Sequence, residues 1–156
     1  MQIHSLGFDS LCEDEYSLIG IHTTLEDYKL AYLLNRILGT SFSKSKKDLH
    51  IEELSKKTAF SLYNYSNLEY EFEWFLIANS SKRENQTESN ELLLTTETKT
   101  YLISEKKKVD FFIKISGNVS YSFVVKTIDK INTIDQVITS YSIDKNTLKS
   151  KDFLII

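Results

Sequence analysis

The stretch Val-Asp-Phe-Phe-Ile-Lys-Ile-Ser, residues Val109–Ser116, constrains the fold more than any other part of the sequence. Its length and its β-branched and aromatic residues are typical of a strand at the centre of a sheet. A Gly-Asn pair then ends the strand, and apolar residues recur at helical spacing from Val124 to Ile131. Gln136–Ile143 again has the composition of a strand. The pattern therefore predicts a strand–helix–strand unit in the C-terminal half.

A second strand and helix are predicted near the start of the sequence. The run Tyr16–His22 has the length of a buried strand, and Thr23 and Thr24 follow it as candidate N-caps of a helix. Gly39 marks the end of that helix, because glycine readily adopts the left-handed conformation found there. The apolar stripe of the helix is wide, so we expect burial along much of its length. The stripe consists of Leu25, Tyr28, Leu30, Ala31, Leu33, Leu34, Ile37 and Leu38.

The middle of the chain has weaker strand signals. Two strands are predicted at Ala59–Tyr65 and Tyr70–Ile77. The second alternates aromatic residues with glutamates, which predicts a sheet with one face in solvent. Ser80–Glu91 is polar throughout and is predicted to be a loop. Two further strands are predicted at Leu92–Thr95 and Lys99–Ile103.

Together these patterns predict an α+β fold with a mainly antiparallel sheet, two main helices on one face and the C-terminal strand–helix–strand unit. The C-terminal half has the pattern of half of a ferredoxin-like fold. No repeat, linker or low-complexity tract interrupts the sequence. We therefore expect residues 1–156 to form a single globular domain.

The composition is that of an average soluble protein, with 41% hydrophobic and 26% charged residues. A net charge of -3 argues against nucleic-acid binding over the whole surface but leaves room for a local basic patch. We expect a cytoplasmic protein with no membrane contact, because no signal peptide and no apolar run of about 18 residues is present. Cys12 is the only cysteine, which excludes an intrachain disulfide.

Neither a metal site nor a catalytic centre is predicted. His4, His22, His50 and Cys12 lack the paired spacing that zinc sites use. The sequence also lacks the Gly-rich phosphate-binding motifs and the nucleophile-elbow motif of hydrolases. We therefore expect no cofactor, and the sequence favours a non-catalytic protein over an enzyme.

The charged connector Ile-Ser-Glu-Lys-Lys-Lys-Val-Asp-Phe, residues 103–111, resembles the signature of the IPExxxVDY family, which comprises bacterial proteins of the Bacteroidetes group. The similarity extends over residues 14–35 and 141–152. Ser104 stands where the signature has Pro, and Phe111 stands where it has Tyr. No activity is assigned to that family, so the resemblance implies none. The Phe at position 111 indicates that this position is structural.

Three features are candidates for interaction with a partner. Two are lysine-rich loops, and the third is the apolar end of the sequence. We also expect Asp110 to be exposed or bonded to a lysine or a backbone N–H, because an unpaired buried carboxylate is costly. The candidate residues are Lys44, Lys46, Lys47, Lys106, Lys107, Lys108, Asp110, Phe153, Leu154, Ile155 and Ile156.

The last four of these residues are predicted to return to the domain as an edge strand or plug, with strand addition to a partner as the alternative. The leading hypothesis for function is a module that binds a protein partner or self-associates as a homodimer. The alternatives are an RNA-associated accessory protein that uses the lysine-rich loops, and a small-molecule-sensing domain of the ACT type. The sequence gives little sign of a small-molecule site.

Overall fold

The structure is a computed structural model that describes residues 15–53, 56–67, 69, 72–85 and 96–156. Its strands are β1 Tyr16–Thr23, β2 Ser43–Lys44, β3 Leu49–Glu53, β4 Lys56–Phe60, β5 Leu62–Asn67, β6 Phe72–Ala78, β7 Ser80–Asn85, β8 Thr96–Tyr101, β9 Phe111–Ser116 and β10 Val137–Ile143. Its α-helices are α2 Asp27–Leu38 and α3 Tyr121–Asn132, and its 3-10 helices are η1 Ser104–Lys106, η2 Lys145–Thr147 and η3 Lys151–Leu154.

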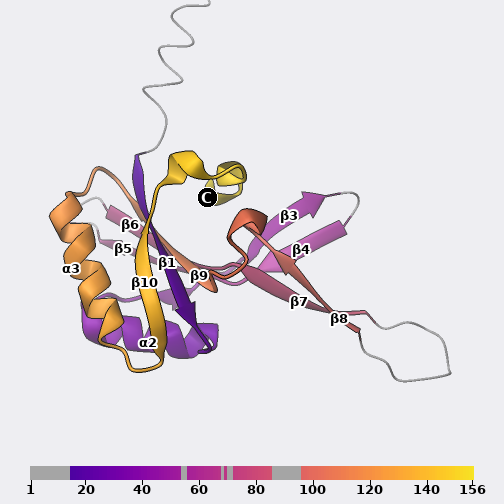
Figure 1. Ribbon diagram of the computed structural model, residues 1–156, viewed down its shortest axis with the longest axis horizontal. Coiled ribbons are helices and arrows are strands. Elements are labelled where there is room, and N and C mark those ends of the chain that lie inside the picture. Colours follow the sequence, from indigo (N-terminus) through magenta and orange to yellow (C-terminus); the bar gives the residue numbers. More distant parts are fainter. Residues whose placement is uncertain (1–14, 54–55, 68, 70–71, 86–95) are drawn as a thin grey trace, which may run out of the picture.

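A six-stranded antiparallel sheet organises the molecule, with the strand order β10-β1-β9-β6-β5-β2 (Figure 1). The strands β1, β6, β9 and β10, with α2 after β1 and α3 after β9, follow the split βαβ order of a ferredoxin-like fold. The other strands are insertions between these elements. The predicted α+β class, the mainly antiparallel sheet and the C-terminal strand–helix–strand unit are therefore confirmed.

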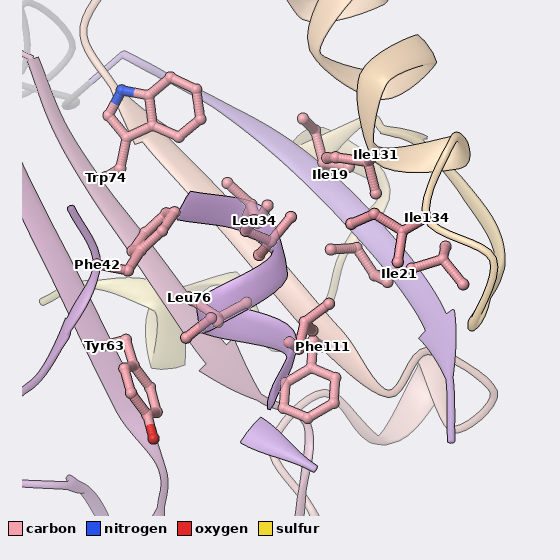
Figure 2. Packing of buried hydrophobic residues seen from close by; sticks show 14 of the residues in the cluster. Ile19, Ile21, Leu34, Phe42, Tyr63, Trp74, Leu76, Phe111, Ile131 and Ile134 are labelled. Carbon is pink, nitrogen blue, oxygen red and sulfur yellow. The ribbon is translucent and has the colours of Figure 1, made fainter. Parts of the chain in front are cut away.

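Both α-helices pack on one face of this sheet, as predicted (Figure 2). Ile19 and Ile21 of β1 point toward this face together with Ile113 of β9, and all three are fully buried. Leu34 of α2 and Ile131 of α3 pack against them and are also fully buried. The long-range contacts among these side chains hold two short helices that would not be stable alone in water.

The opposite face of the sheet is also covered, and here the sequence prediction was wrong. We predicted one solvent face for the strand that contains β6, yet Phe75 and Ile77 on that face are buried. They pack in a second cluster with Phe112 of β9, Leu102 of the segment before η1 and Leu154 of η3. Segments far away in the sequence supply the cover, so local alternation could not reveal it.

The start of α2 also differs from the prediction. Thr23 belongs to β1, where its hydroxyl donates to the Gln136 carbonyl at 2.8 Å. The helix begins at Asp27, and its N-cap residue Glu26 makes no side-chain cap. The predicted end is confirmed, since Gly39 has φ 68° and its N–H donates to the Asn35 carbonyl.

The predicted strands of the middle region are partly wrong. Ala59–Tyr65 is divided at Ser61 between β4, which pairs with β3, and β5, which pairs with β6. Ser80–Asn85 is not a loop but strand β7, which pairs with β8 in a separate two-stranded ribbon. The predicted strand at residues 92–95 lies outside the described residues. Figure 1 shows this ribbon and the β3–β4 ribbon projecting from the same side of the sheet.

Candidate functional site

Lys44, a predicted interaction residue, lies in a polar cluster at the start of β5. Its ammonium group donates to the Ser61 hydroxyl at 2.7 Å and lies 2.9 Å from the Asp48 carboxylate. The same ammonium group lies 3.8 Å from the Asp27 carboxylate and 5.3 Å from the centre of the Tyr63 ring. The Ser61 hydroxyl in turn donates to Asp27.

This cluster ties the first turn of α2 to the edge of the sheet. The Asp27 carboxylate also accepts from the Tyr28 N–H, a favourable place for a negative charge at a helix N-terminus. Burial raises the pKa of the Tyr63 hydroxyl, and the Asp27 carboxylate to which it is hydrogen-bonded raises it further. Because these groups satisfy one another, we interpret Lys44 as structural. Lys46 and Lys47 beside it are exposed.

Asp110, the second candidate, has the backbone partner that we predicted. Its carboxylate accepts from the Thr23 N–H at 2.9 Å, and its own N–H donates to the Ile21 carbonyl at 2.9 Å. These bonds join the start of β9 to the end of β1. Asp110 is therefore a structural residue with a satisfied charge rather than an unpaired carboxylate.

The loop before Asp110 is organised by a fully buried asparagine, Asn79. Its side-chain amide donates to the carbonyls of Lys106 and Val109, both at 2.8 Å, and its side-chain oxygen accepts from the Ile103 N–H at 2.8 Å. Its backbone carbonyl accepts from the Leu102 N–H at 2.8 Å. All three of these side-chain bonds go to backbone groups of the loop. Asn79 therefore fixes the conformation of the loop backbone.

Glu105 fastens the end of the described chain to this loop. One carboxylate oxygen accepts from the Ser150 N–H at 2.8 Å, and the other accepts from the Ser150 hydroxyl at 2.9 Å. Burial alone would raise the pKa of Glu105, but the hydrogen bonds from Ser150 and from the Lys149 N–H outweigh burial and hold the pKa below its usual value. These Glu105–Ser150 hydrogen bonds hold the segment that follows β10 against η1, and we call them the latch.

The segment that resembles the family signature is therefore structural at each position where the two agree or nearly agree. Ile103 and Val109 are buried in the second cluster, and Phe111 is buried in the helix-side core. Glu105 and Asp110 form the bonds described above. The prediction that position 111 is structural fits this burial, because Phe111 packs among apolar side chains.

The predicted plug at the end of the sequence is formed in part. Leu154 is fully buried and Phe153 packs against the second cluster, but both lie in η3 rather than in an edge strand. The Lys114 ammonium group donates to the Leu154 carbonyl at 2.8 Å. Ile155 and Ile156 keep 71% and 43% of their surface exposed.

The candidate docking site that the structure adds is a groove along α2, with a volume of 420 Å³. Within the predicted apolar stripe, Tyr28 is 54% exposed, and Tyr32 beside it is 61% exposed. The Lys29 ammonium group lies 5.7 Å from the centre of the Tyr28 ring, and the Arg36 guanidinium lies 5.9 Å from that of Tyr32. The groove is lined by Leu25, Tyr28, Lys29, Tyr32, Leu33 and Gln136.

The groove corrects the expectation that α2 is buried along much of its length. Only Leu30, Ala31 and Leu34 are buried, since the sheet covers a narrower stripe than the sequence offers. Sequence reasoning missed the groove because it assigned Tyr28 to the core. The signal that could have revealed it is the excess of apolar positions over what one helix face can bury, with cationic residues between them.

Strand β10 lies at one edge of the sheet, and two features there disfavour pairing with a strand of another molecule. The Asn132 side-chain oxygen accepts from the Ser140 N–H and from the Ser140 hydroxyl, both at 2.9 Å, where a neighbouring strand would otherwise bond. The register with β1 shifts between His22 and Thr23, which pair with Thr139 and Val137, so Ile138 forms a bulge. A bulge and a bonded edge amide both disfavour edge-to-edge association.

No metal centre is found in the part of the chain that the structure describes, where no three His, Cys, Asp or Glu side chains come together. His22 instead bonds the Tyr141 hydroxyl at 2.8 Å. His4 and Cys12 lie outside the described residues. Neither α2 nor α3 combines the length and hydrophobicity that a membrane span requires among the described residues.

Comparison of the sequence with known proteins identifies no relative, since no protein-family model and no curated protein matches the chain.

Proposed function

We propose that this chain is a non-catalytic module that binds a protein partner through the groove along α2. The observation that carries the proposal is the pair of half-exposed tyrosines, Tyr28 and Tyr32, that line an apolar groove on a helix otherwise packed on the core. Tyrosine is enriched among the residues that dominate binding energy at protein interfaces. Contiguous exposed apolar surface, unlike single scattered residues, is typical of interaction sites.

The groove favours a partner segment with an apolar side chain flanked by carboxylates. Lys29 and Arg36 are exposed beside the two tyrosines, and α2 contains no acidic residue after Asp27. A carboxylate of the partner would therefore meet Lys29, which lines the groove beside Tyr28, or Arg36, which lies near the Tyr32 ring. Such complementarity selects the partner and speeds association more than it adds affinity.

A second copy of the chain fits this surface less well. A two-fold axis through the groove would bring Lys29 and Arg36 of one copy against the same cations of the other, and like charges facing each other oppose association. The guarded β10 edge disfavours pairing through the sheet as well. These two features support a separate partner over a homodimer.

We also propose a cellular compartment and a family for the chain. The single cysteine suits a reducing compartment, so we place the interaction in the cytoplasm. The resemblance of residues 103–111 to the IPExxxVDY signature supports membership of that bacterial family, which we also propose. The structural roles of Glu105 and Asp110 are consistent with this assignment but do not depend on it.

The test compares variants as baits in affinity purification from the native cell, followed by binding measurements with the purified partner. Tyr32→Ser is expected to weaken the purified partner's binding at least tenfold, in the range of an interface hot spot. Tyr121→Ser is the matched control, because Tyr121 lies on α3 with 79% of its surface exposed. Equal binding by both variants would refute the proposal. The proposal would also be refuted if the purified chain formed a dimer and Tyr32→Ser abolished that dimer, because the groove would then bind a second copy of the chain.

A further inference from the structure

A basic patch forms where the segment after β10 meets η1. Ser150 is bonded to Glu105, and Lys149 and Lys151 flank Ser150 in the sequence. The run Lys106–Lys108 directly follows Glu105. The latch thus brings together two groups of lysines that are about forty residues apart in the chain. Lys107, Lys108, Lys149 and Lys151 are all exposed.

A tyrosine ring lies within this patch. The ammonium groups of Lys99 and Lys107 lie 5.5 Å and 5.7 Å from the centre of the Tyr101 ring, so the two charges are no more than about 11 Å apart. That separation is close to the Debye length of about 8–10 Å at ordinary ionic strength, so their potentials add at the surface. Tyr101 itself is half-buried.

The carboxylates closest to the patch keep their negative charge but are outnumbered by its lysines, Lys99, Lys106, Lys107, Lys108, Lys149 and Lys151. Glu105 accepts two hydrogen bonds from Ser150, and Asp110 accepts one from the Thr23 N–H. Asp152 is the exposed carboxylate of the segment. The patch is therefore a local excess of positive charge on a chain with net charge -3.

We propose that this patch binds single-stranded nucleic acid, with phosphates on the lysines and a base on the face of Tyr101. The lysine side chains that lie over the ring are flexible and exposed, so an incoming base can displace them and leave them free for the flanking phosphates. Lysines around an aromatic ring are the combination that sequence-tolerant single-strand binders use. Unpaired bases are required, because in a duplex their faces are stacked on one another.

The alternative polyanion, an acidic protein segment, is less well suited to the patch. It would satisfy the lysines but would leave the Tyr101 face without a planar partner. The proposed site also lies apart from the α2 groove, because α2 packs in the first cluster while Leu102 and Ile103, next to Tyr101, pack in the second cluster on the opposite face of the sheet. Binding here therefore neither requires nor excludes the partner proposed above.

The test measures fluorescence anisotropy of labelled 12-nucleotide oligouridine, oligothymidine and a duplex RNA with the purified full chain. Single strands are expected to bind at 50 mM salt. If about four phosphates are neutralised, affinity should fall about 50-fold between 50 and 200 mM salt, because each contributes roughly 0.7 to the logarithmic slope. Preference for oligouridine over oligothymidine would identify RNA as the ligand, and equal affinity would identify single strands of either kind.

Three variants locate the site. The double variant Lys107→Glu, Lys149→Glu is expected to lose about tenfold or more in affinity. Tyr101→Leu keeps every charge and should lose several-fold through lost stacking. The control is Lys126→Glu, Lys130→Glu, which changes two exposed lysines of α3 by the same total charge. Circular dichroism and thermal melting verify that each variant is folded.

Several results would overturn the proposal. One is no binding at 50 mM salt, and another is equal loss of affinity in the patch and control variants. A duplex bound as tightly as the single strands, with no effect of Tyr101→Leu, would show simple charge attraction. Competition by poly-glutamate at equal charge concentration would show that an acidic protein is the better ligand.

Discussion

Replacing Asn79 by alanine is expected to destabilise the fold by about 2–7 kcal/mol, a large share of the roughly 5–15 kcal/mol that holds a domain of this kind together. Asn79 is fully buried, and its side chain supplies the hydrogen bonds that fix the loop from Ile103 to Val109. The alanine variant keeps the backbone but removes all of these bonds at once.

The magnitude follows from the groups that the variant leaves without partners. The bonds to the Val109 carbonyl and from the Ile103 N–H are buried, and each stranded group costs about 1–3 kcal/mol. The Lys106 carbonyl keeps the hydrogen bond from the Val109 N–H, so the loss of its bond to Asn79 costs less. The sum of two full penalties and one reduced penalty gives the stated range.

The assay is urea unfolding at pH 7, followed by circular dichroism, with free energies of unfolding compared between variants. Asn118→Ala is the matched control, because Asn118 is exposed and should change stability by no more than about 0.5 kcal/mol. Hydrogen exchange at the Ile103 amide reports the loop directly and should quicken in the Asn79 variant. A loss below about 1 kcal/mol would refute the reasoning, since it would mean that water reaches the loop and satisfies its backbone.

Three further predictions test other parts of the structure. Leu34→Ala should cost about 2–5 kcal/mol in urea unfolding, because Leu34 is fully buried; a parent-like stability would contradict its place in the core. Glu105→Gln should be less stable than the parent at neutral pH. Since the folded pKa of Glu105 is lowered, this difference should shrink as pH falls below its ordinary value of 4.5, and a constant difference would exclude the carboxylate as its source. Asn132→Ala should increase self-association in sedimentation measurements by freeing the Ser140 N–H, whereas an unchanged monomer would show that the bulge alone protects the edge.

The elements that the sequence predicted well are those whose periodicity is local. The strands β1, β9 and β10 and the helices α2 and α3 each contain an apolar pattern that fits one kind of element. Residues 59–65 show why the insertions were harder. The run has the composition of one strand, but Phe60 ends a strand that pairs with β3, and Leu62 begins one that pairs with β6. The choice of partner is a long-range property that no local pattern contains.

The candidate sites depend even more on contacts between distant residues. The lysine runs at 106–108 and 149–151 are separate surface loops in the sequence, and the Glu105–Ser150 bonds join them across 45 positions. The groove along α2 likewise depends on how much of the helix the sheet covers. In the other lysine-rich loop, Lys44 had the opposite outcome, because Asp27 and Asp48 already engage it, while Lys46 and Lys47 are exposed.

The two proposed surfaces lie in different layers of the molecule, which determines how they can influence each other. Tyr28 and Tyr32 belong to the helix layer, while Tyr101 and Glu105 lie beside the second cluster on the opposite face. Between them stands a six-stranded sheet whose central residues Ile113 and Phe112 are fully buried on its two sides. A close-packed sheet does not change shape in response to a contact at one surface unless it has a second arrangement. Occupation of the groove should therefore leave binding at the lysine patch unchanged, as expected for sites without shared residues.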